Sequence, residues 1–115
     1  MGIIDKIFGK KKITKPLLDS KVQSFIGLEF AMYLTWVEDT TKKSIMGKEL
    51  ERRIDLFLKK EKQLGRIKDY NKDDVMMINI LALASDTKNL QDTRKKNKLD
   101  YRWPKFEEHI GLKKK

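Results

Sequence analysis

Residues 73–86, DDVMMINILALASD, form a stretch whose apolar side chains point to every side of a helix. Nine apolar residues are interrupted by a single asparagine, and at 100° per residue they surround the axis. A helix of this kind is buried or spans a membrane, and about ten apolar residues are half of what a span needs. Asn71 followed three residues later by Asp74 predicts the helix start. We therefore expect 73–85 to be the central, buried helix of the core.

Two longer stretches predict helices that pack on this central one. From 21 to 38, eight large apolar side chains fall on one side of a helix, and 44–63 carries an amphipathic stripe of Met46, Leu50, Ile54, Phe57 and Leu58. The alternating residues of 65–71 are compatible with a short strand, although no partner strand is evident. We expect an all-α single domain, a small bundle of three main helices (21–38, 44–63, 73–85) with short basic helical segments at both ends.

Glu29 is the polar residue whose place in this pattern is unusual. It falls near the centre of the apolar side of 21–38. A carboxylate there must be protonated, paired, or reached by water. One interpretation is structural, with Glu29 paired to a cation from another helix or lying at a gap in the packing. The other is functional, with Glu29 acting as a buried switch or lining a small pocket.

The formal net charge of +10 is concentrated at the two ends of the chain. Residues 1–16 hold five lysines against one aspartate, and 92–115 hold nine basic against four acidic residues. Between them, 17–91 is nearly neutral. We expect a basic amphipathic segment and linker (1–16), a helical core domain (17–91) and a basic C-terminal extension with a short helix (92–115). Basic ends favour contact with nucleic acid or an anionic membrane, and improved solubility is the alternative.

Residues 1–12, MGIIDKIFGKKK, place four apolar side chains within an arc of about 140° on a helix, followed by lysines. This pattern is typical of a short interfacial membrane anchor. The alternatives are that the strip docks on the domain's own core or on a partner, or that the segment is disordered. Because a helix of eight residues is weak by itself, we expect weak or no membrane-surface contact. The docking residues would be Ile3, Ile4, Ile7 and Phe8.

Basic pairs and an aromatic-basic stretch supply candidate contacts for nucleic acid. Cations would bind phosphates, and an aromatic ring within 101–106 would stack on a base. The aromatic residues next to proline could instead pin the C-terminal segment to the core. One contiguous basic face would favour nucleic-acid binding, whereas basic ends projecting from a body of mixed charge would favour an adaptor that binds another protein. The predicted contacts are Arg52, Arg53, Lys59, Lys60, Arg94, Lys95, Lys96 and Arg102, with Trp103 stacking.

The sequence offers little for catalysis. It has no cysteine and one histidine, and it lacks the patterns of a nucleophile elbow, a P-loop or a dinucleotide-binding loop. His109 beside Glu107 and Glu108 does not form a metal site, because adjacent residues on a helix diverge. We expect no enzyme activity, no cofactor and no metal.

Our first hypothesis is a small accessory or regulatory protein that binds nucleic acid, most simply DNA. The alternative is an adaptor or inhibitor that binds another protein, attached to a membrane surface through residues 1–12. The wide apolar side of 21–38 also permits a homodimer. Without cysteine, signal peptide or span, we expect a cytoplasmic protein. The abundance of Lys, Ile, Asn and Asp is typical of AT-rich bacterial, plasmid and phage genes.

Overall fold

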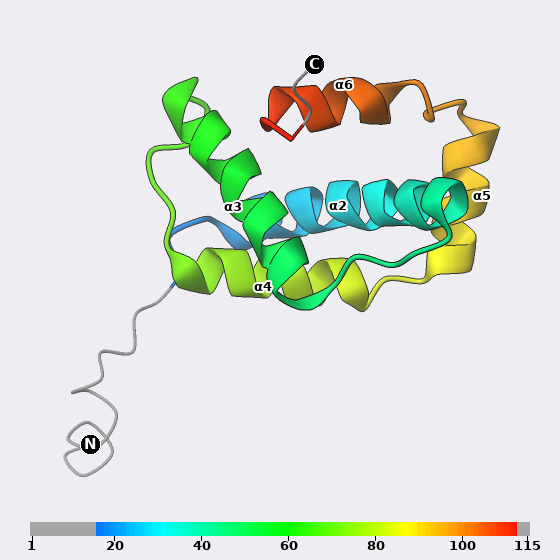
Figure 1. Cartoon of the computed structure of the whole chain (residues 1–115). Coiled ribbons are helices and arrows are strands. Elements are labelled where there is room, and N and C mark those ends of the chain that lie inside the picture. Colours follow the sequence, from blue (N-terminus) through cyan, green and yellow to red (C-terminus); the bar gives the residue numbers. More distant parts are fainter. Residues whose placement is uncertain (1–15, 113–115) are drawn as a thin grey trace, which may run out of the picture.

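A computed structural model describes residues 16–112, and all of their regular structure is helical (Figure 1). The prediction of an all-helical fold is confirmed, and 65–71, compatible with a strand, is a loop. The predicted N-terminal helical segment, with Ile3, Ile4, Ile7 and Phe8, lies outside the described residues. The helices are α2 (Ser20–Thr41), α3 (Gly47–Gln63), α4 (Lys72–Leu83), α5 (Thr87–Lys96) and α6 (Arg102–His109).

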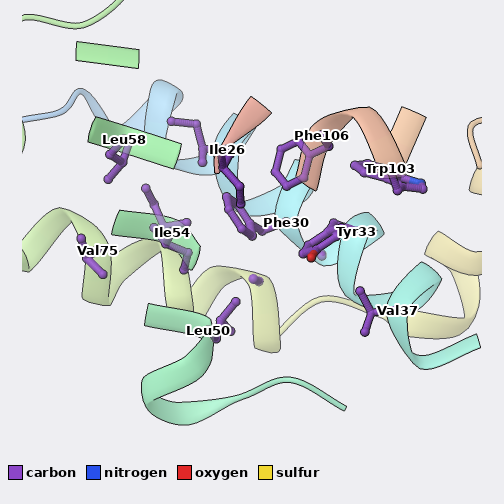
Figure 2. Packing of buried hydrophobic residues seen from close by; sticks show 14 of the residues in the cluster. Ile26, Phe30, Tyr33, Val37, Leu50, Ile54, Leu58, Val75, Trp103 and Phe106 are labelled. Carbon is purple, nitrogen blue, oxygen red and sulfur yellow. The ribbon is translucent and has the colours of Figure 1, made fainter. Parts of the chain in front are cut away.

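The longest helix, α2, is the one around which the others pack. In Figure 1 it runs between α6 and α4, with α3 crossing obliquely and α5 standing across its C-terminal end. Figure 2 shows Phe30 and Tyr33 of α2 facing Phe106 and Trp103 of α6. The ring centroid of Phe106 lies 5.4 Å from that of Phe30 and 4.9 Å from that of Tyr33. These aromatic contacts between α2 and α6 form one half of a single core.

The amphipathic stripe of α3 supplies the other half of the core. Leu50, Ile54 and Leu58 are fully buried, as their spacing predicts. The helix begins three residues later than predicted, because 44–46 is extended and Gly47 takes a positive φ of 64°. Met46 therefore precedes the helix and stays exposed rather than joining the stripe.

The prediction that the 73–85 helix is central and buried on every side is wrong. α4 buries Val75, Ile78 and Ala82 against α2 and α3. Its opposite side exposes a row of large apolar side chains, including Ile80, which is 57% exposed. Among residues 16–112 no element covers that side. Hydrophobicity alone could not distinguish the two sides, because both are equally apolar.

The start of α4 is fixed by the capping box that Asn71 and Asp74 predict. The Asp74 backbone N–H donates to the Asn71 side chain at 3.1 Å, and the Asn71 N–H donates back to Asp74 at 2.9 Å. Asp74 is fully buried and also accepts hydrogen bonds from the backbone N–H groups of Leu17 and Leu18 and from the side chain of Gln23. One carboxylate thus joins the first described residues, α2 and α4.

The C-terminal residues belong to the core rather than to a separate extension. The boundary predicted between 91 and 92 falls inside α5. Leu90 of α5, Trp103 and Phe106 of α6, and Ile110 are all buried in the same cluster as the α2 and α3 residues. The described fold is therefore continuous from α2 to Ile110.

Candidate functional site

The basic residues predicted on α3 differ in their exposure. Arg52 and Lys59 are exposed, whereas Arg53 and Lys60 are partly buried. Arg52 makes an ion pair with Glu49 at 3.0 Å, and Arg53 reaches the same carboxylate at 2.6 Å. Together these two arginines hold the pKa of Glu49 below its usual value. Part of the predicted basic face is thereby neutralised.

Arg53 is also built into a buried network. Its Nη1 donates to the Tyr33 hydroxyl at 2.6 Å, and that hydroxyl donates to Glu107 Oε2 at 2.7 Å. Burial, followed by the hydrogen bond to Glu107, raises the pKa of Tyr33 far above its usual value, so the phenol remains protonated. The network links α2, α3 and α6, and it occupies the guanidinium that was predicted to contact phosphate.

Arg94 must be removed from the predicted phosphate contacts, because its side chain is fully buried. It donates to Asp39 and Asp100, each at 2.6 Å, and to the Thr35 hydroxyl at 2.7 Å. A buried cation needs such compensation to remain charged. The neighbouring Lys95 and Lys96 are exposed. In the run 94–96, the first residue therefore has a structural role and the other two lie at the surface.

Arg102 and Trp103 likewise contact other residues of the fold. Arg102 of α6 forms an ion pair with Glu29 of α2 and lies over the Trp103 ring, 4.9 Å from its centroid. Trp103 is fully buried, so it offers no free face on which a base could stack. The burial of Trp103 agrees with the other interpretation of this stretch, in which an aromatic residue next to proline holds the C-terminal segment against the core.

Glu29 is mostly buried and paired with a cation from another helix, which is the structural interpretation of its unusual position. Desolvation raises its pKa, and the charge and hydrogen bond of Arg102 oppose that rise. Its arrangement is that of an interhelical ion pair at the edge of the core.

The predicted basic residues do not form one contiguous face. Arg94 is inside the fold, and α3 and α5 are separated by α2 in Figure 1. The exposed cations of α3 therefore lie apart from Lys95 and Lys96. The condition that would favour nucleic acid is not met by the predicted set.

The most distinctive surface is instead an apolar one, shared by α2 and α4. Phe25 of α2 is 71% exposed, and Leu28 follows it one helical turn later with 44% exposure. On α4 the exposed side chains follow helical spacing on one side of the helix. We name this surface the α2–α4 apolar face; it comprises Phe25, Leu28, Met76, Met77, Ile80 and Leu83.

The two helices of this face approach each other closely at Gly27. A Cβ atom at Gly27 would lie 2.8 Å from the Leu81 Cβ, which is closer than side-chain atoms pack. The side of each helix that faces α3 and α6 is buried. At 100° per residue, Leu28 of α2 and both Met77 and Ile80 of α4 therefore point to the opposite surface, on either side of the crossing. Leu28, Met77 and Ile80 are therefore exposed apolar side chains on the same outer surface of the α2–α4 pair.

Catalytic or metal-binding groups are not gathered at this face. Within residues 16–112 no three His, Asp or Glu side chains lie close enough together to hold a metal ion. In the same residues, no helix is both long and apolar enough to cross a membrane. What the face can do chemically is bury apolar surface against another apolar surface.

Comparison of the chain with family models, with curated proteins and with solved structures found no match.

Proposed function

We propose that the protein is a protein-interaction module, an adaptor or inhibitor, that binds an amphipathic helix of its partner on the α2–α4 apolar face. The supporting observation is the row of large, exposed apolar side chains on two adjacent helices. Single exposed apolar residues are ordinary on protein surfaces, but a contiguous patch marks an interaction site. We also propose a cytoplasmic location, because the sequence has no cysteine.

The composition of the face suits a helical ligand. Two closely packed helices leave a shallow apolar channel between their outer side chains, and a third helix with anchors at i, i+3, i+4 and i+7 fits such a channel. Met76 and Met77 contribute unbranched, adaptable side chains, which are common on surfaces that accept a helix. Lys21 and Ser24 are polar residues beside Phe25 and Leu28 on the α2 side of the face.

Photo-crosslinking in the cells that naturally express the protein tests this proposal. Benzoylphenylalanine in place of Ile80 is expected to give a discrete heavier adduct, and the same probe in place of Lys59 on the exposed side of α3 is expected to give none. Adding Leu28→Lys should remove the adduct at position 80. Equal adducts at both positions, or none at position 80, would overturn the proposal.

A second candidate is nucleic-acid binding through α3, favoured by one observation. Lys48, Arg52 and Lys59 are exposed, and they fall within a narrow arc of the α3 surface. Anisotropy of a labelled duplex across a salt series would measure this contact. Replacing all three residues by alanine should reduce the slope of log K against log salt by about 2–3, whereas Lys21→Ala on α2 should reduce it by at most about 1. No binding at low salt would remove this candidate.

A further inference from the structure

The chain enters the described part of the structure at one end of the α2–α4 apolar face. The backbone N–H groups of Leu17 and Leu18 donate to the Asp74 carboxylate at 3.1 and 3.0 Å, beside the first turn of α4. Residues 1–15 precede this anchor and lie outside the described residues. They are therefore tethered where α2 and α4 both begin, one turn away from Met77.

The length of this segment matches the size of the face. From Met76 to Leu83 the face extends about 10 Å along α4, since each helical residue rises 1.5 Å. Residues 3–8, which carry the apolar strip, span about 9 Å as a helix. Residues 13–16 can extend by about 13 Å, enough to return the strip to the face from its anchor.

We propose that residues 1–12 occupy the α2–α4 apolar face in the free protein, so that a partner helix must displace them. The strip of Ile3, Ile4, Ile7 and Phe8 would cover the exposed side chains of α4 and Leu28. The displacement of residues 1–12 by a partner helix rests on the proposed function. The contact of these residues with the face does not depend on it.

The position of the tether favours this occupant over a free ligand or a membrane. A short tether raises the effective concentration of the strip at the face to about the millimolar range, which compensates for the weak binding of a single short helix.

Paramagnetic relaxation measured on the purified full chain tests the contact. Because the sequence has no cysteine, Lys6→Cys introduces a single site for a nitroxide on the polar side of the strip. We expect the methyl signals of Met76 and Met77 to broaden, and to recover when the nitroxide is reduced. The matched control carries the same label with Ile4→Asp and Ile7→Asp, and its broadening should fall several-fold, to the level that a freely moving tether of this length produces.

Three results would overturn the inference. Absence of broadening, or equal broadening in the control, would mean that the strip does not hold the segment on the face. Broadening that appears between a labelled copy and a separate isotope-enriched copy would make a second chain the occupant. Co-sedimentation with anionic vesicles without broadening of Met76 and Met77 would assign the strip to a membrane.

The displacement step has its own readout, which separates this inference from the proposed function. With Ile4→Asp and Ile7→Asp, the partner adduct at position 80 should increase several-fold, whereas Lys6→Ala should leave it unchanged. If the Met76 and Met77 signals broaden but neither the double aspartate variant nor Lys6→Ala gives a partner adduct, the proposed function is refuted and the intramolecular contact stands. If the double aspartate variant gives the same yield of partner adduct as the original chain, a partner does not have to displace residues 1–12.

Discussion

The guanidinium of Arg94 in α5 lies 2.6 Å from the carboxylate of Asp39 in α2, with the arginine side chain fully buried. Asp100 and Thr35 accept the other hydrogen bonds of the guanidinium. The Arg94 side chain holds the pKa of Asp39 below its usual value. This cluster fixes α5 and the turn before α6 to the C-terminal end of α2, so a residue in a basic run acts as a structural joint.

Removing both acidic partners should therefore be costly. The double variant Asp39→Asn, Asp100→Asn leaves the buried guanidinium without an opposite charge, and we expect the free energy of unfolding to fall by about 3–5 kcal/mol. Urea denaturation measures the loss. Lys96→Ala, an exposed change in the same run, should alter stability by less than about 0.5 kcal/mol. Equal effects of the two variants would contradict the buried joint.

Asp74→Asn should destabilise the fold more than its position in a first turn suggests. The buried carboxylate accepts four hydrogen bonds, from Leu17, Leu18, Gln23 and Asn71, and an amide has only one oxygen to accept them. We expect a loss of about 3 kcal/mol or more. The neighbouring Asp73→Asn, which leaves the capping box in place, should cost less than about 1 kcal/mol in the same urea titration.

Gly27→Ala tests the close crossing of α2 and α4. Alanine favours a helix over glycine by about 1 kcal/mol, yet its Cβ would meet the Leu81 Cβ at 2.8 Å. Because both atoms are held close to helical backbone, we expect a net loss of about 1–3 kcal/mol. Ser24→Ala, on the exposed side of the same helix, should be neutral or slightly stabilising. A stabilising Gly27→Ala would mean that the helices are further apart.

Two isoleucines of α4 test which side of this helix faces the core. Ile78→Ala removes a fully buried side chain and should cost about 2–5 kcal/mol. Ile80→Ala changes a side chain that α2 and α3 leave exposed, and it should cost less than about 1 kcal/mol. Thermal or urea unfolding of both variants gives the comparison. A larger loss of stability for Ile80→Ala than for Ile78→Ala would mean that the side of α4 carrying Ile80 faces the core.

Glu29 and Asp39 should respond to pH in opposite directions. Burial raises the folded-state pKa of Glu29, so its contribution is present below the unfolded value and is lost as pH rises through the folded pKa. Wild type should gain stability relative to Glu29→Gln between pH 7 and pH 5. Arg94 lowers the pKa of Asp39, so its contribution is present above the unfolded value and is lost as pH falls through the folded pKa, below about pH 4. Urea titrations across this range measure both trends.

Local patterns predicted several parts of the fold directly. The stripe of α3 identified Leu50, Ile54 and Leu58 as core, because a regular amphipathic helix has one apolar side. The spacing of Asn71 and Asp74 identified the start of α4, since a capping box depends on residues within one turn. Both features are settled by interactions between residues close in sequence.

The candidate site depends on contacts between distant residues, and there the sequence was insufficient. Nothing in the apolar stretch of α4 distinguishes Ile78 from Ile80; the packing of α2 and α3 decides which is covered. The burial of Arg94 had one usable signal. It lies four residues after Leu90, and therefore on the same side of a helix as the only large apolar residue of that region.

The hydrogen bonds from Leu17 and Leu18 to Asp74 also determine how the beginning of the chain moves. An ordinary tail exchanges its amide hydrogens with solvent at the unprotected rate, but these two amides exchange only when their hydrogen bonds to Asp74 break. Local unfolding of the first turn of α4 would displace that carboxylate and release both amides. Opening of the N-terminal end of α4 therefore also frees the point at which residues 1–12 join the domain, so amide exchange at Leu17 and Leu18 reports on this end of the helix.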